Sequence, residues 1–86
     1  MKHIRMSRHA TIRAVQRGAT EEEVMDCVRE ADRRTMQGDK VIYRKTFPFN
    51  DRSPVNGLIY QRKTVELICA EGPEIVVITV KVYYLK

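Results

Sequence analysis

A histidine followed by two arginines is the grouping in this sequence that is best suited to chemistry. His9, Arg13 and Arg17 are spaced at i, i+4 and i+8, so they share one face if the segment is helical. Arg8 adds a further positive charge beside them. RNA cleavage needs a group that removes the 2′-hydroxyl proton, a group that protonates the leaving oxygen, and cations that stabilise the phosphorane. Imidazole exchanges protons near neutral pH and guanidinium binds phosphate, so the spacing is compatible with RNA cleavage without a metal.

The same spacing has a purely structural explanation. His9 would then pack or hydrogen-bond where the helix meets a sheet, while Arg13 and Arg17 would pair with acids such as Glu21 or Glu22. A histidine and arginines on one helical face form a weak pattern, and spacing alone favours this structural interpretation.

A second group of basic and aromatic residues lies in the C-terminal third of the chain. Its members are Tyr60, Arg62, Lys63, Lys81 and Tyr83. Tyrosines interleaved with basic side chains suit stacking on unpaired bases beside phosphate contacts. The alternative is the polar surface of ordinary amphipathic strands, so neither group alone decides the function.

Composition is consistent with one small globular domain, residues 1–86. Hydrophobic residues make up 43% and charged residues 31%, which argues against a disordered chain. The formal net charge is +5 and arginine is more frequent than lysine, which favours a polyanionic partner such as RNA. A basic surface with no such partner would give the same composition.

Several classes of site and location are not indicated. Cys27 and Cys69 are far apart and belong to no CxxC pair, so we expect reduced, buried cysteines, no metal and no cofactor. Gly-rich phosphate loops, GxSxG, HExxH and EF-hand patterns are absent from the sequence. No apolar run approaches the roughly 20 residues that span a bilayer, and no signal peptide is recognisable at the N-terminus. We therefore expect a cytoplasmic protein without membrane contact.

Two helices are expected to position the first group. Ser7 is suited to cap a helix over residues 7–17, and Gly18 to end it. Thr20 and Glu23 form a capping-box pattern at the start of the second helix. The apolar stripe of that helix comprises Val24, Cys27, Val28 and Ala31.

Strands are expected at residues 40–47, 63–71 and 75–85, where β-branched and aromatic residues are frequent, with a long loop over residues 48–57. Strict alternation in the last strand predicts that the even-numbered residues from Val76 to Tyr84 face the core. The expected fold is α+β, with two N-terminal helices packed on a curved antiparallel sheet of three to four strands.

The stretch from Ser7 to Val24 runs from His-Ala through Arg-Gly to Thr-Glu-Glu. It resembles the opening of a bacterial domain-of-unknown-function family of small RelE-like and BrnT-like toxin-fold proteins. Residues 75–80 are similar to the terminal strand of that family, so the resemblance covers about half of the chain. It implies the architecture of ribonuclease toxins that a cognate antitoxin neutralises. His9, Arg13 and Arg17 match polar positions of the family's first helix, and Thr79 matches one in its last strand.

The resulting hypothesis is a toxin-like, metal-independent RNA endonuclease of a toxin–antitoxin system. His9 would act as general base or acid, Arg13 and Arg17 would hold the scissile phosphate, and Lys81 and Tyr83 would position RNA. The alternative is a non-catalytic RNA-binding or protein-interaction module with the same basic surface, whose RNA binding would weaken with salt. A third possibility is a structural domain whose edge strand pairs with another chain.

Overall fold

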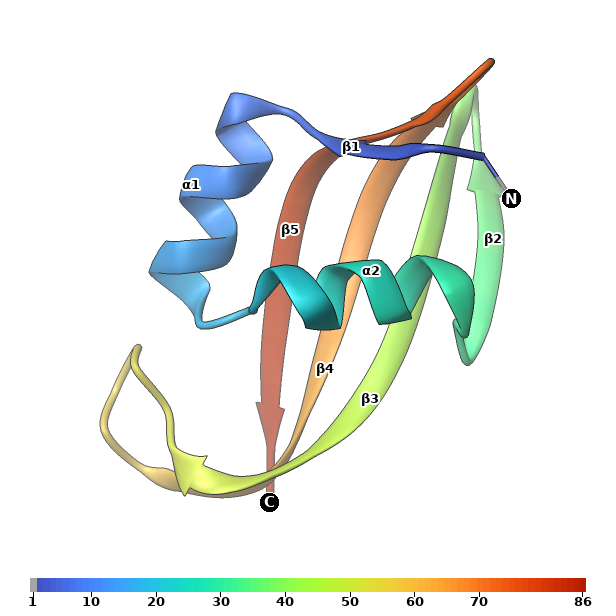
Figure 1. Ribbon diagram of the computed structural model, residues 1–86. Helices are drawn as coiled ribbons and strands as arrows, with labels where there is room; N and C mark the ends of the chain where they lie inside the picture. The colour runs from blue at the N-terminus through green and yellow to red at the C-terminus, as the bar shows by residue number, and fades with distance from the viewer. Residues whose placement is uncertain (1) are drawn as a thin grey trace.

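The computed structural model describes residues 2–86, which fold into one five-stranded sheet with two helices (Figure 1). The elements are β1 (Ile4–Met6), α1 (Arg8–Arg17), α2 (Glu21–Arg29), β2 (Arg33–Gln37), β3 (Lys40–Arg52), β4 (Ile59–Glu71) and β5 (Ile75–Leu85). The strand order is β1-β5-β4-β3-β2, with β1 parallel to β5 and the other pairs antiparallel. The chain is α+β and has two helices, but the expected antiparallel sheet of three to four strands is wrong because the sheet is mixed and has five.

The two unexpected strands, β1 and β2, lie at the two ends of the strand order. β1 has three residues and pairs through Ile4 with Ile75 of β5. β2 has the sequence RRTMQ, in which only Thr35 has high strand propensity, and it is specified by its pairing with β3. Pairing with a neighbour therefore decides the structure where local propensity is weak.

Both helices begin, and α1 also ends, as their capping residues predict. The Ser7 side chain accepts a hydrogen bond from the Ala10 N–H at 3.0 Å, and Gly18 ends α1 in the left-handed conformation at φ 84°. Thr20 and Glu23 form both bonds of the capping box at the start of α2. These caps place the helix ends, and so fix which α1 side chains face the sheet.

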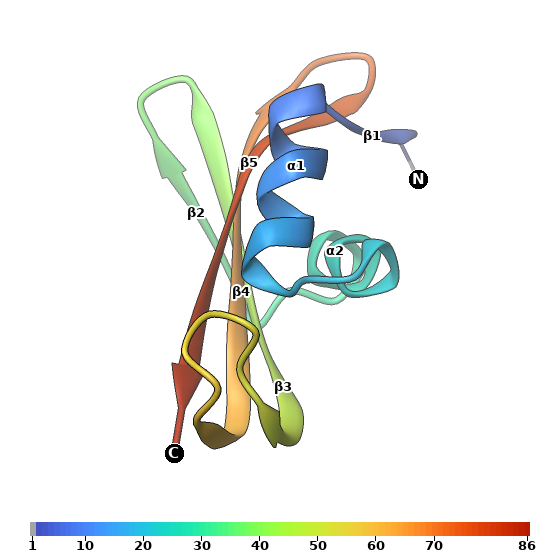
Figure 2. The ribbon, with the colours of Figure 1, turned by 90° about the vertical axis from the view of Figure 1, so that its left-hand side faces the viewer.

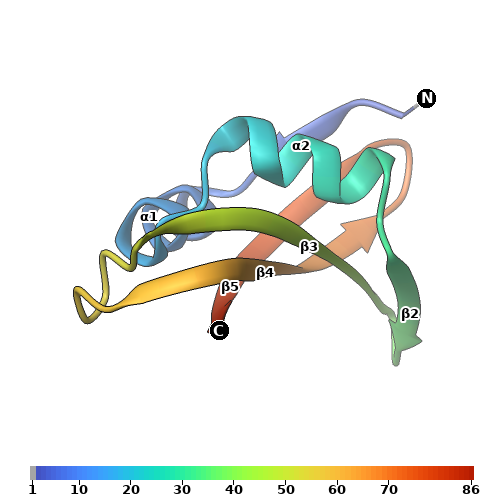
Figure 3. The same cartoon turned by 90° about the horizontal axis from the view of Figure 1, so that it is seen from below.

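The helices α1 and α2 lie on the same face of the sheet, and the opposite face carries neither of them (Figures 2 and 3). The hydrophobic core fills the space between helices and sheet. Its fully buried members include Val24, Cys27, Val65, Leu67, Cys69, Val77 and Val80. The helix-free side, called the open face below, is therefore where the sheet's own side chains meet solvent.

A β-bulge in β5 changes which residues of that strand face the core. Thr79 pairs with Ile68 and Val77 pairs with Cys69, which leaves Ile78 as an extra residue. Before the bulge Val77 is buried, and after it Val80 is buried. The predicted even-numbered core face is therefore wrong for Val76 and Ile78, because one inserted residue shifts the alternation.

The long loop expected over residues 48–57 is shorter than predicted. β3 continues through Pro48, which pairs with Arg62, as far as Arg52. A register shift between Pro48 and Asp51, with Asn50 at φ 52°, accommodates this irregular sequence within the strand. Turn-forming residues therefore predict a loop where the pairing with β4 produces a strand.

Candidate nucleic-acid interface

A row of charged side chains crosses the open face. Arg33, Arg44, Glu66 and Lys81 lie directly opposite one another on β2, β3, β4 and β5. Strands are about 4.8 Å apart, so the row spans roughly 14 Å. Three cations and one acid give the row a net positive charge.

An arginine in the middle of this row links an acid to an aromatic ring. A nitrogen of the Arg44 guanidinium, Nη2, lies 2.8 Å from Oε2 of Glu66. The Arg44 Cζ atom lies 5.6 Å from the centre of the Tyr83 ring, within the range of a cation–π contact. Tyr83 is 42% exposed, so part of its ring remains open to a ligand.

Two hollows adjoin the row. One, of about 190 Å³, is lined by Arg33, Thr35, Ile42, Arg44 and Glu66. The other, of about 270 Å³, is lined by Arg17, Lys81, Val82 and Tyr83. The second hollow brings one residue of α1 together with three residues of β5, and because Lys81 and Tyr83 are among them it joins the two groups that the sequence suggests separately.

Arg17 is held in this second hollow by the backbone of β5. Its Nη1 atom donates a hydrogen bond of 2.7 Å to the carbonyl oxygen of Val80. The other nitrogens of the guanidinium form no hydrogen bond with residues 2–86 in this structure. Because a guanidinium carries five N–H donors, Arg17 can be anchored and still bind an anion.

The predicted catalytic trio is only partly assembled. Four residues of helix rise by about 6 Å, so His9 begins roughly 12 Å from Arg17 along the axis of α1. His9 is exposed and hydrogen-bonds to no residue of the part that the structure describes, while Arg13 donates to Gln16 Oε1 at 3.0 Å. Neither His9 nor Arg13 lines the hollow beside Arg17. Arg8 is exposed at the start of α1.

Lys63, expected to contact RNA, points into the protein instead. Its side chain is 5% exposed, and its Nζ atom lies 2.7 Å from Oε1 of Glu23 and donates to the Gly18 carbonyl oxygen at 2.8 Å. It also lies 5.0 Å from the centre of the Phe49 ring. We correct its assignment: Lys63 faces the helices because its neighbour Val65, two residues on, is in the core, and alternate residues share a face.

The other predicted contacts are dispersed. The Tyr60 ring lies 5.6 Å from the Tyr84 ring, and its hydroxyl accepts a hydrogen bond from Asn56. Arg62 is exposed at the end of the sheet opposite Leu85, whereas Thr79 is half-buried beside Ile68. These residues do not line the hollow that contains Arg17.

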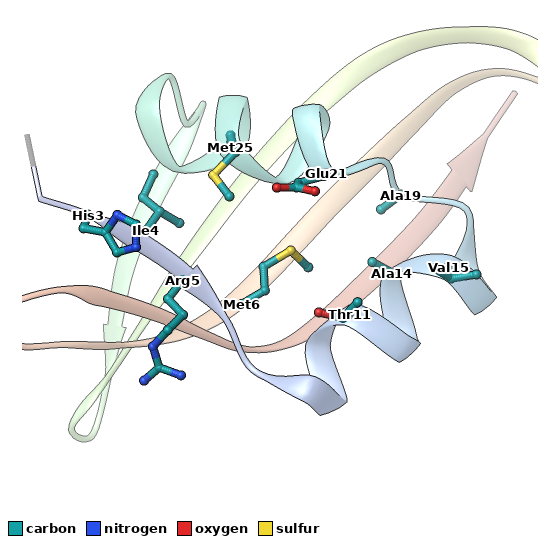
Figure 4. Close-up of a pocket in the computed structure, with 10 residues that line it drawn as sticks. All are labelled: His3, Ile4, Arg5, Met6, Thr11, Ala14, Val15, Ala19, Glu21 and Met25. Carbon is teal, nitrogen blue, oxygen red and sulfur yellow. The ribbon is translucent and has the colours of Figure 1, made fainter.

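A third hollow, of about 310 Å³, lies on the helix side between β1, α1 and α2 (Figure 4). Its lining is mixed: apolar side chains such as Ile4, Met6 and Met25 lie beside His3, Arg5, Thr11 and Glu21. Arg5 is already paired with Glu74, its Nε atom lying 3.0 Å from Oε1, and Glu21 adds a carboxylate, so this hollow is less suited to a phosphate than the one that contains Arg17.

Comparison with known proteins adds no assignment. No protein-family model, curated protein or solved structure matches the chain. The resemblance to toxin-fold proteins therefore stays a prediction.

Sequence reasoning missed Arg33, Arg44 and Glu66, which come from three different strands. Their alignment depends on strand register, which requires β2 to be recognised as a strand. Arg44 and Glu66 directly follow and precede the core residues Tyr43 and Leu67, so alternation within β3 and β4 predicts that both face away from the core. The sequence therefore contained a signal for these two residues.

Metal-binding and membrane-spanning features are missing from the described part of the chain. Among residues 2–86, no group of three or more histidine, cysteine, aspartate or glutamate side chains is arranged to hold a metal ion. Neither α1 nor α2, the helices of this part of the chain, is long and apolar enough to cross a membrane.

Proposed function

We propose that this protein binds single-stranded RNA along the open face of its sheet and around the edge of β5 that faces Arg17. The observation that carries the proposal is the hollow in which Arg17, Lys81 and Tyr83 meet, at one end of the charged row. Cations neutralise phosphates and an exposed aromatic ring stacks on a base, and proteins that bind unpaired strands combine these two contacts.

The shape and chemistry of the face favour unpaired RNA over a duplex. A base in a duplex is covered by its neighbours, whereas an unpaired base can stack on a side chain such as Tyr83 and present its edge to others. The hollow beside Arg44 lies between side chains of the sheet and the one beside Tyr83 lies between β5 and Arg17 of α1; both are small, so splayed bases rather than a rigid helix fit. The net charge of +5 adds an attraction that does not depend on sequence.

The geometry favours binding over cleavage. A nucleophile–base arrangement usually has the base oriented by a third group, and His9 has no hydrogen-bond partner within residues 2–86. Its separation of roughly 12 Å from Arg17 along the helix also keeps the two from a shared phosphate, since side chains on one helical face project in parallel. RNA cleavage and neutralisation by an antitoxin protein, which the toxin resemblance implies, have no support here beyond the charge of the face.

Fluorescence anisotropy with a labelled oligouridylate tests the proposal. We expect Tyr83→Ala to weaken binding by fivefold or more, because stacking of one base contributes about 1–3 kcal/mol. Lys81→Ala should lower the slope of log affinity against log salt by about 0.7, the value for one phosphate contact on a single strand. Arg29→Ala is the matched control, since Arg29 is an exposed arginine of α2 on the opposite side of the sheet.

The proposal fails if the wild-type protein does not bind the oligouridylate at low salt. It also fails if Tyr83→Ala and Lys81→Ala bind as tightly as Arg29→Ala, because the contact surface would then lie elsewhere. A tighter complex with duplex RNA than with the single strand would contradict the assignment of the ligand.

A further inference from the structure

Glu66 is the one acidic member of a row that otherwise attracts phosphate. It lies on β4 between Arg44 of β3 and Lys81 of β5, and its side chain is 15% exposed. A carboxylate at this place repels the backbone of an RNA ligand. Because the Glu66 carboxylate repels phosphate, it is better suited to contact the base of a nucleotide.

The pairing of Glu66 leaves acceptor capacity unused. Oε2 forms the 2.8 Å ion pair with Arg44, and within residues 2–86 the carboxylate forms an ion pair with no other residue. A carboxylate has about four acceptor positions and no donor, so it can accept further hydrogen bonds. Arg44 offsets the negative charge, and the pair borders the hollow of about 190 Å³.

Tyr83 is the nearest exposed aromatic ring on the same face. Tyr83 pairs with Thr64 and Lys81 pairs with Glu66, so Tyr83 and Glu66 are diagonal neighbours on β5 and β4. Diagonal side chains on one face lie about 7–8 Å apart, within reach of aromatic and long side chains. A base that stacks on Tyr83 would therefore present an edge towards Glu66.

We propose that Glu66 reads the base and selects guanine, an inference that rests on the RNA-binding function proposed above. The Watson–Crick edge of guanine has two adjacent donors, the N1–H and the N2 amine, which match a carboxylate. Adenine and cytosine each offer one amine beside an acceptor ring nitrogen, and uracil offers one N–H between two carbonyl oxygens. Guanine is thus the only one of the four bases that meets the carboxylate with two donors and no intervening acceptor.

The test compares three labelled RNAs of equal length by anisotropy: an oligouridylate, one with alternating guanine and uracil, and the same sequence with inosine in place of guanine. We expect the wild-type protein to bind the guanine RNA about tenfold more tightly than oligouridylate, as for one specific bidentate contact. The inosine RNA, which lacks the N2 amine, should lose most of that preference. Glu66→Gln should bind the guanine RNA and the oligouridylate with nearly equal affinity, because the amide replaces one acceptor oxygen by a donor.

The outcomes separate this inference from the function on which it depends. Absence of oligouridylate binding would overturn the RNA-binding proposal itself. Binding of oligouridylate with no preference for guanine, or a guanine preference that persists in Glu66→Gln, would overturn the role of Glu66 and leave RNA binding intact. The inosine comparison uses only wild-type protein, so it can contradict the proposal even if Glu66→Gln fails to fold, which thermal unfolding would reveal: an inosine RNA that binds as tightly as the guanine RNA would overturn the two-donor contact.

Discussion

The Nζ atom of Lys63 lies 2.7 Å from Oε1 of Glu23, and so joins β4 to the first turn of α2. The same Nζ donates to the Gly18 carbonyl oxygen at 2.8 Å, where α1 ends. One buried cation therefore ties the junction of the two helices to the sheet. Since Arg17 precedes Gly18, this contact also positions the helix end that carries the proposed phosphate-binding group.

Loss of this cation should destabilise the fold. Lys63→Met removes one partner of a nearly buried ion pair and leaves Glu23 without its cation, which we expect to lower the free energy of unfolding by about 3 kcal/mol. Urea unfolding followed by circular dichroism measures the change. Lys81→Met, at an exposed lysine of β5, serves as the control and should stay within about 0.5 kcal/mol of wild type. Equal stability of the two variants would mean that the Lys63–Glu23 contact contributes nothing.

Gly18 should tolerate no side chain. It has φ 84°, and a Cβ atom there would lie 2.5 Å from the Tyr84 hydroxyl oxygen and 2.6 Å from Cγ of Pro54. Tyr84 donates to the Arg17 carbonyl oxygen at 2.6 Å, so it cannot move without losing that bond. We expect Gly18→Ala to cost at least about 2 kcal/mol, from the left-handed backbone and the steric overlap together.

Gly72→Ala is the matched control for Gly18→Ala, because Gly72 has no positive φ and a Cβ atom added there would meet nothing within 4 Å. Thermal unfolding should place the Gly72 variant close to wild type and the Gly18 variant well below it. A Gly18 variant as stable as the Gly72 variant would show that the turn between α1 and α2 can relax.

Local chemistry explains which parts of the fold could be predicted. The capping residues Ser7, Thr20 and Gly18 act within a few positions of themselves, and they correctly predict where both helices begin and where α1 ends. The bulge at Ile78 depends on how β5 pairs with β4, which no alternation pattern within β5 records. Pairing likewise overrides the turn-forming residues around Pro48.

The candidate site is harder to predict than the helices, because it depends on the register between strands and on the packing of α1 beside β5. Arg17, Lys81 and Tyr83 belong to two separate groups in the sequence, and only the packing of α1 beside β5 brings them together. Sequence alone favours a surface position for Lys63 because a buried lysine is rare, and its partner Glu23 has a complete local explanation in the capping box. Glu23 takes part in both the capping box and the ion pair with Lys63, and the sequence reveals only the capping box, because Thr20 is three residues away.

The two buried cysteines should make stability fall at alkaline pH. Burial raises the pKa of both thiols, Cys27 and Cys69, from 9.0 to about 12. Above pH 9.0 the unfolded chain loses these protons while the folded chain keeps them, so stability that is fully present below that pH is lost as pH rises towards about 12. The loss is up to roughly 1.4 kcal/mol per pH unit for each thiol.

Urea unfolding at a series of pH values measures this effect, with the double variant Cys27→Ala, Cys69→Ala as the control. The control lacks both thiols, so its stability should fall less steeply above pH 9.0 than that of wild type. Parallel curves would mean that the thiols titrate alike in the folded and unfolded chains.

Cleavage is the outcome that would most change the interpretation of this protein. We expect purified wild-type protein to leave total RNA intact in EDTA, because His9 is exposed, lacks an orienting partner within residues 2–86, and does not line the hollow that holds Arg17. His9→Ala, with folding verified by circular dichroism, should leave RNA intact as well and bind oligouridylate as wild type does. Fragments from wild type but not from His9→Ala would instead establish metal-independent cleavage through His9. Bound RNA would then have to change the position of α1 or of the His9 side chain. Fragments from both would place the chemistry on other residues, and Arg17, Lys81 and Tyr83 would be the first to substitute, because they already share one hollow.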